Sequence, residues 1–138
     1  MPLPQRWGTH GRVGLPLFWM ALLWWQSSKT STEAGVLLRW LAQWLPALIP
    51  ADKFVHAVLY AVLCGLWMWA RPGRPWQALG LALAYGAVDE WHQSWVAGRD
   101  ASVLDWLADG VGASIMGAVW MLAGKGPASP KGMPAVPR

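Results

Sequence analysis

The sequence has little charge and almost no cysteine, and each shortage excludes a class of protein. Only 13% of its 138 residues are charged, against about 25% in a typical soluble domain, which argues against an ordinary soluble enzyme. Cys64 is the single cysteine, so a domain stabilised by internal disulfides is excluded. A disordered chain is excluded as well, because 55% of the residues are hydrophobic and 13 are tryptophan.

Familiar catalytic motifs are also missing. The sequence has no HExxH zinc motif, no phosphate-binding loop with its lysine and no nucleophile elbow. Its basic residues flank apolar runs instead of forming a patch, so nothing predicts nucleic-acid binding. The function must therefore be inferred from the apolar runs and from the polar residues at their ends.

Apolar runs long enough to cross a bilayer dominate the chain. A transmembrane helix needs about 20 apolar residues, and four runs approach or reach that length, over 13–28, 52–70, 76–96 and 105–123. They predict an all-α integral membrane protein with four transmembrane helices, in a domain over 13–123. The first run has a basic flank but no small-residue cleavage site, so we expect it to remain as a span.

The stretch between the first two runs predicts a helix of another kind. Thr30 and Glu33 have the spacing of a capping box, and pairs of apolar residues then recur every four positions with polar residues opposite. The expected helix over 33–49 is too short and too polar on one face to span. It should lie in the outer interface with Trp40 and Trp44 inserted, or pack as a lid on the bundle.

The distribution of charge predicts the orientation. In the four-span layout, 7 of the 11 basic residues fall on one side and all 7 acidic residues fall on the other. Because basic residues accumulate in cytoplasmic loops, we assign the first side to the cytoplasm. The prediction is a multi-pass protein of the bacterial cytoplasmic (inner) membrane, with a cytoplasmic flank over 1–12 and a disordered cytoplasmic tail over 124–138.

Small residues at four-residue spacing predict where the helices meet. The third run carries Ala78, Ala82 and Gly86. The fourth run carries Gly110, Ser114 and Ala118, and beside them Ala113 and Gly117. Small residues let helices approach closely in lipid, within one chain or between two copies, so an oligomer formed through these faces stays open.

Polar residues gather at the outer ends of the last three runs. The candidate site consists of Asp52, Lys53, His56, Tyr60, Glu90, Gln93, Arg99, Asp105 and Asp109. An ionisable group in the apolar zone costs about 2.5–3.5 kcal/mol on insertion scales, so these groups should face one another. Asp105 and Asp109 repel across one helical turn. A cation is expected between them, and the candidates are Arg99, Lys53 and His56.

The motifs at these ends resemble the VanZ-like family of small bacterial membrane proteins. The resemblance rests on Asp-Lys-x-x-His-x-x-x-Tyr at 52–60, Glu-x-x-Gln at 90–93, Arg99, and Asp-x-x-x-Asp-x-x-Gly at 105–112. It covers half of the chain, from Asp52 to Trp120. It implies a cell-envelope protein, with a link to antibiotic resistance because the founding member is associated with resistance to the lipoglycopeptide teicoplanin. The resemblance therefore names a family and does not imply a particular reaction.

Binding is the first function that these residues favour. Lys53, Arg99 and protonated His56 could hold an anionic group at the outer leaflet, such as the phosphate of an envelope lipid or of a lipid-linked precursor. The expected partners are therefore membrane lipids. A structural network of ion pairs that fixes the helix register, with no ligand, is an alternative.

Catalysis on a lipid-linked substrate is a second alternative, so whether the protein is an enzyme stays open. His56, Glu90, Asp105 and Asp109 could act as acid and base, or could hold a divalent metal as cofactor. Transport of ions or protons is disfavoured, because the inner half of every span lacks ionisable groups and a path would end halfway.

Overall fold

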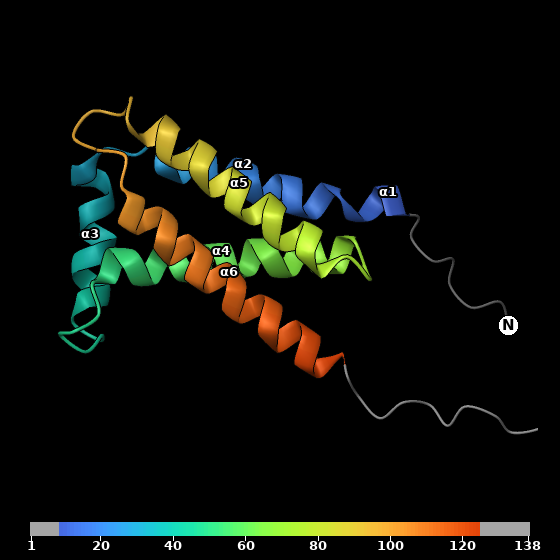
Figure 1. Cartoon of the computed structure of the whole chain (residues 1–138). Coiled ribbons are helices and arrows are strands. Elements are labelled where there is room, and N and C mark those ends of the chain that lie inside the picture. The colour runs from blue at the N-terminus through green and yellow to red at the C-terminus, as the bar shows by residue number, and fades with distance from the viewer. Residues whose placement is uncertain (1–8, 125–138) are drawn as a thin grey trace, which may run out of the picture.

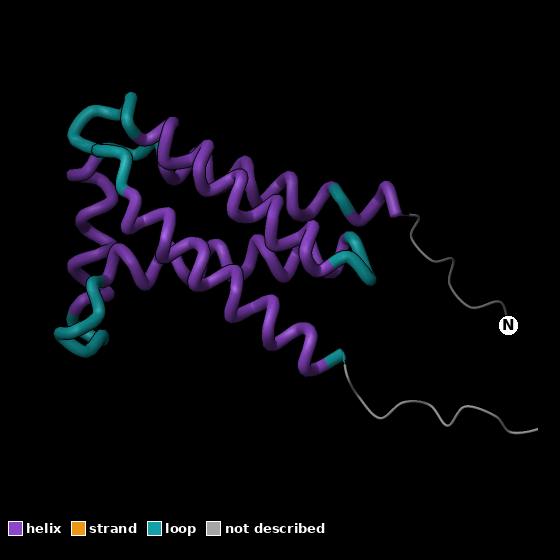
Figure 2. Tube along the Cα trace, viewed as in Figure 1, coloured by secondary structure: helices purple, strands orange, loops and turns teal. Residues whose placement is uncertain are grey.

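The computed structural model of the chain describes residues 9–124. In this part the chain forms helices joined by loops and turns (Figure 1). The helices are α1 (Thr9–Arg12), α2 (Gly14–Ser27), α3 (Ser31–Ala42), α4 (Ala51–Ala70), α5 (Pro75–Gln93) and α6 (Val103–Ala123). Between residues 9 and 124 there is no strand (Figure 2). The predicted all-α class is therefore confirmed. Most of the expected flank over 1–12 and nearly all of the expected tail over 124–138 lie outside the described residues.

Four helices, α2, α4, α5 and α6, run side by side, and α3 lies across one end of them (Figure 1). We call this the α3 end. It holds the last turn of α2, the last two turns of α5, the first turn of α4, the first two turns of α6, and the α5–α6 loop (94–102). All the acidic residues belong to α3 or to these segments. The acidic residues, which the sequence places on one side of the membrane, therefore lie together at one end of the folded bundle.

Helices α4 and α6 are long and apolar enough to cross a membrane by length and composition. Helix α2 has only 14 residues, and α5 carries several polar residues in its last two turns. Large apolar side chains are nevertheless exposed along α2, α4, α5 and α6, among them Leu15, Phe18, Trp25, Val58, Trp76, Val111, Ile115 and Val119. These features favour a membrane protein, and by length and composition two of the helices, α4 and α6, qualify as spans.

The closest approach in the bundle is between α4 and α6. A Cβ atom added at Gly112 would lie 1.8 Å from the backbone oxygen of Ala57, so only glycine fits this crossing. Around it lies a core of buried residues, which are Leu23, Tyr60, Leu63, Cys64, Trp67, Met68, Ala70, Ala78, Ala82 and Ala113. The crossing therefore fixes the first half of α4 against the first half of α6.

The predicted small-residue faces are partly correct. The stripe on α5, Ala78, Ala82 and Gly86, is buried inside the chain. On α6, Ala113 and Gly117 are buried beside Gly112. Ser114 and Ala118 are exposed, so of the two stripes on α6 it is the one with Ala113 and Gly117 that is buried within the chain. As exposed small residues, Ser114 and Ala118 stay open to contact with a second copy.

Helix α3 begins where the capping residues predict and ends earlier than expected. Glu33 Oε2 accepts hydrogen bonds from the backbone N–H and the hydroxyl of Thr30, both at 2.9 Å. The helix ends at Ala42 and not at residue 49, because Pro46 lacks an N–H and its ring clashes with the carbonyl four residues earlier. The other expected ranges differ from the observed helices by at most three residues at each end.

The two faces of α3 differ in burial. Ala34 is buried, and with Ser31 and Leu38 it lines a pocket at the α3 end. Trp40 on α3 is 56% exposed, and Trp44, in the turn after the helix, is 74% exposed. The helix thus covers the bundle with one face and presents tryptophan to the surroundings with the other.

Candidate functional site

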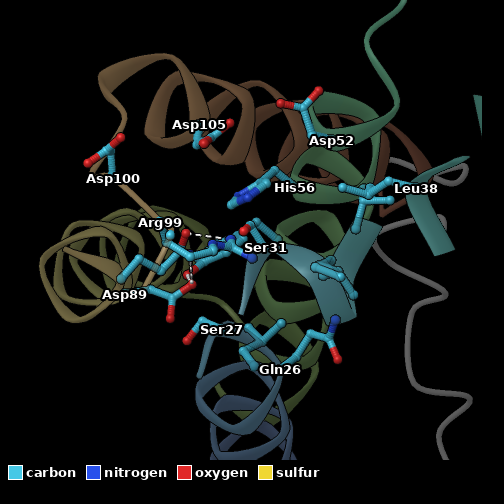
Figure 3. Close-up of a pocket in the computed structure, with 17 residues that line it drawn as sticks. Gln26, Ser27, Ser31, Leu38, Asp52, His56, Asp89, Arg99, Asp100 and Asp105 are labelled. Atoms are coloured by element: carbon cyan, nitrogen blue, oxygen red, sulfur yellow. Dashed lines mark hydrogen bonds between the residues drawn. The ribbon is translucent and has the colours of Figure 1, made fainter. Parts of the chain in front are cut away.

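A pocket of about 290 Å³ lies at the α3 end (Figure 3). Its walls come from the end of α2, from α3, from the beginnings of α4 and α6, and from the end of α5 with the loop that follows. Six of the nine predicted site residues line it, namely Asp52, His56, Tyr60, Gln93, Arg99 and Asp105. The other three, Lys53, Glu90 and Asp109, do not line it and contact the lining residues or the loop.

Lys53 ties the beginning of α4 to the beginning of α6. Its ammonium group donates to Asp52 Oδ2 at 2.9 Å and also to Asp105 Oδ1. The cation expected beside Asp105 is therefore Lys53. Ser102, whose hydroxyl accepts a hydrogen bond from the Asp105 backbone N–H at 3.2 Å, caps α6.

His56 supplies the partner of the second aspartate. His56 Nδ1 lies 2.9 Å from Asp109 Oδ1, and Asp109 is fully buried. Asp52, His56 and Tyr60 all line the pocket, as their four-residue spacing on α4 predicts. The two aspartates of α6 are thus each paired with a different residue of α4.

Glu90 holds the α5–α6 loop through a hydrogen bond to its backbone. Its Oε2 atom accepts a hydrogen bond from the Ser102 backbone N–H at 2.7 Å. One potential metal-ligand atom of Glu90, one of His56 and one of Asp109 all lie within 4.8 Å of one another, which is close enough for a shared metal ion. Asp105 does not belong to this group, because Lys53 holds it; the expected four-residue metal set is reduced to three.

Asp89 belongs to the site although no sequence motif assigned it a role. Its Oδ2 atom accepts hydrogen bonds from the Tyr60 hydroxyl and from Gln93 Nε2, each at 3.3 Å. Gln93 Oε1 in turn accepts from Arg99 Nη2 at 2.6 Å. Gln93 therefore works with Asp89, one helical turn away, and not with Glu90. The four-residue spacing of Asp89 and Gln93 was the signal that could have found this pair.

Arg99 does not lie between the two aspartates of α6. It sits on the pocket wall, and Figure 3 shows it with His56 and Asp89 around the middle of the pocket, whereas Asp52 and Asp100 lie at the edge. Among the described residues, Arg99 makes no ion pair with a carboxylate. Its guanidinium group is therefore available to an anion that enters the pocket.

A second contact that the sequence did not reveal closes the pocket at α2. Ser27 Oγ lies 3.2 Å from His92 Nδ1, and the Trp24 ring stacks on the His92 ring with centroids 3.7 Å apart. Ser27 is buried and lines the pocket. These residues lie on α2 and α5, far apart in the chain, so no local spacing could have indicated the contact.

The fold and the site together define a helical membrane protein with a polar pocket at one end of its bundle. The chain matches the sequence model of the VanZ/LLP1 family over residues 12–124, and it belongs to this VanZ-like family. The match extends the resemblance of the site motifs to α2 and α3. None of the curated proteins and none of the solved structures with which the chain was compared matches it.

Proposed function

We propose that the protein crosses the bacterial cytoplasmic membrane four times, with the α3 end outside. Helices α4 and α6 provide two of the spans. α1 and α2 together run from Thr9 to Ser27 and rise about 28 Å, close to the thickness of the hydrocarbon core of about 30 Å. α5 is of similar length, and the polar residues that lower its hydropathy, Asp89, Glu90 and Gln93, are buried in the bundle.

The orientation follows from the charges at the two ends. Arg12, Arg71 and Arg74 lie at the end opposite α3, and the acidic residues lie at the α3 end. Basic residues accumulate on the cytoplasmic side, which supports an outward-facing pocket.

The pocket, we propose, binds the anionic headgroup of an envelope lipid or of a lipid-linked precursor. The single observation that carries this is Arg99, a cation on the wall of a pocket of about 290 Å³ with no carboxylate partner among the described residues. A guanidinium group binds phosphate through two parallel hydrogen bonds. Lys53, which the sequence also favoured for this role, is occupied by two aspartates and orients them instead.

Asp89 adds a preference for hydrogen-bond donors on the headgroup. Its Oδ1 atom is buried without a hydrogen-bond partner among the described residues, and the residue lines the pocket. A buried carboxylate oxygen is stabilised when a ligand donates to it. The proposed headgroup therefore combines a phosphate for Arg99 with a hydroxyl or ammonium group for Asp89.

Native mass spectrometry of the protein in lipid nanodiscs tests this proposal. The nanodiscs contain equal amounts of phosphatidylglycerol, phosphatidylethanolamine and phosphatidylcholine, of which only the last has no N–H or O–H donor in its headgroup. We expect phosphatidylglycerol, whose headgroup is anionic and carries hydroxyl groups, to stay bound to the wild type and to be lost in Arg99→Ala. Arg39→Ala, which removes an exposed arginine of α3 outside the pocket, should retain it. Equal lipid retention by wild type and Arg99→Ala contradicts the proposal. If Arg99→Ala is also less stable to heat, the site is a structural network.

The cellular consequence that we propose is a change in sensitivity to teicoplanin, through a headgroup held at the outer surface. Cells that produce the wild type and cells that produce equal amounts of Arg99→Ala should then differ in the concentration of teicoplanin that stops growth. Equal sensitivity of the two kinds of cells would contradict the proposed effect on teicoplanin and would leave the lipid-binding proposal untouched.

Catalysis on a bound lipid is a second candidate, favoured by the position of His56. This residue lines the pocket and is oriented by a buried carboxylate at 2.9 Å, an arrangement that suits a general base. Release of headgroup from the bound lipid by the wild type, and its loss in His56→Gln, would support it. A lipid that remains intact with the wild type leaves binding as the function.

A further inference from the structure

Three side chains that can act as metal ligands, from three different helices, meet beside the pocket. They are the imidazole of His56 on α4, the carboxylate of Glu90 on α5 and the carboxylate of Asp109 on α6. One ligand atom of each lies within 4.8 Å of the others. From this convergence and the observations below, we propose that His56, Glu90 and Asp109 bind one divalent transition-metal ion.

Two carboxylate oxygens in this group are unpartnered. Glu90 Oε1 and Asp109 Oδ2 are buried and have no hydrogen-bond partner among the described residues. Both residues are more than nine-tenths buried. A buried ionised oxygen without a partner is costly, so a metal ion that binds these oxygens supplies the missing interaction.

The negative charge of the two carboxylates also favours a bound cation. No lysine or arginine in the described part of the chain forms an ion pair with Glu90 or Asp109. Lys53, the nearest candidate from the sequence, is bonded to Asp52 and Asp105. Two buried carboxylates therefore share one imidazole, and a divalent cation balances them where a protonated histidine balances only one.

The short contact between His56 and Asp109 fits two neighbouring metal ligands. His56 Nδ1 and Asp109 Oδ1 are 2.9 Å apart. Adjacent ligands of an octahedral ion lie about 3 Å apart when each bond to the metal is about 2.1 Å long. The same separation also fits a hydrogen bond, so metal binding has to be measured directly.

Supporting contacts hold the third ligand. The Ser102 backbone N–H donates to Glu90 Oε2 at 2.7 Å and leaves Oε1 free. Ligating carboxylates are commonly held in this way by a second hydrogen bond. One imidazole with two carboxylates suits Zn²⁺ or Mn²⁺ better than Mg²⁺, which prefers oxygen alone.

Mn²⁺ titration of the purified full-length chain tests the site. The protein is stripped of metal with a chelator in phospholipid-free detergent at neutral pH, and the signal of free Mn²⁺ is followed by electron paramagnetic resonance. We expect the wild type to bind one equivalent, and added Zn²⁺ to release it. The lipid-binding proposal is not involved in this measurement, so either proposal can fail without the other.

Matched variants locate the bound ion. Glu90→Gln and Asp109→Asn keep the size of each side chain and should weaken Mn²⁺ binding about tenfold or more. Asp100→Asn, on the exposed loop, should bind as the wild type does. Circular dichroism establishes that each variant is folded.

Two results would overturn the proposal. The first is a folded wild type that binds neither Mn²⁺ nor Zn²⁺. The second is equal affinity in wild type and in folded Glu90→Gln and Asp109→Asn. If these variants do not fold, X-ray absorption of the Zn²⁺-loaded wild type decides, since the site predicts one imidazole with oxygen ligands. Sulfur or a second imidazole in the coordination shell rejects it.

Discussion

The backbone oxygen of Ala57 occupies the space that a side chain at Gly112 would need, with only 1.8 Å to the position of its Cβ atom. Ala57 directly follows His56, and Gly112 lies about one helical turn beyond Asp109, so this contact is beside the pair of His56 and Asp109, which joins the same two helices. The close crossing of α4 and α6 therefore sets the distance across the polar site, and the site depends on a residue with no polar atoms in its side chain.

Gly112→Ala should strongly destabilise the bundle. The clash is with backbone and not with a mobile side chain, so the helices must move apart, at a cost of about 3 kcal/mol or more. Gly80→Ala is the matched control, because a Cβ there meets nothing within 4 Å and the higher helix propensity of alanine should stabilise the chain by up to about 1 kcal/mol. Thermal unfolding in detergent compares the two. Equal melting temperatures would show that the crossing is looser than the structure indicates.

Lys53→Met should destabilise the protein through Asp105. The Asp105 side chain is only 13% exposed, and without Lys53 it is left without a cation, which costs about 2 kcal/mol. Combining the change with Asp105→Asn should recover part of this loss, as a double-mutant cycle on unfolding free energies measures. Asp52→Asn removes the other contact of Lys53, but the Asp52 side chain is 45% exposed and its loss should cost less than about 1 kcal/mol. A larger effect for Asp52→Asn would reverse the assigned importance of the two pairs.

The start of α3 should depend on pH. The Thr30 backbone N–H, assisted by the Thr30 hydroxyl, donates to Glu33 and holds the pKa of that carboxyl below its ordinary value of 4.5. Because the folded pKa is lowered, this contribution to stability is present above pH 4.5 and is lost as the pH falls through the lowered pKa. Hydrogen-exchange protection of α3 amides, measured against α4 amides as an internal reference, should decrease on acidification. Glu33→Gln should remove this pH dependence; if it does not, another group controls the start of α3.

The helices and the general position of the site could be predicted from local patterns. Apolar runs and capping residues mark the helices because their physical causes lie within a few residues of one another. The spacing of Asp52, His56 and Tyr60 placed them on one face of α4 for the same reason. Pro46 is also a local signal, but the expected range ran past it to residue 49, so the prediction of this boundary was wrong although its cause is present in the sequence.

The pairing of charges could not be predicted, because it depends on how the helices cross. Lys53 and His56 were both candidates for the aspartates of α6, and the crossing at Gly112 decides that Lys53 contacts Asp105 while His56 contacts Asp109. The contact of Ser27 with His92 joins α2 to α5. No spacing within one helix carries information about such a contact.

The single cysteine makes the proposed topology easy to test. Cys64 is fully buried in α4, so a membrane-impermeant maleimide should leave the wild type unlabelled in intact cells and after permeabilisation. Cysteines introduced at exposed positions then report their own side of the membrane. Labelling of the wild type would show that Cys64 is accessible, and the probes would have to be placed in Cys64→Ala.

Five cysteine substitutions at exposed positions follow the chain through the proposed spans. Thr32→Cys and Ala97→Cys lie at the α3 end, whereas Gly11→Cys, Pro72→Cys and Gly124→Cys lie at the opposite end. Four spans with the pocket outside predict that only the first two react in intact cells, and that the other three react after permeabilisation. The opposite pattern would invert the protein and place the pocket in the cytoplasm. If Gly11→Cys and Thr32→Cys react on the same side, α2 does not cross, and the protein has three spans.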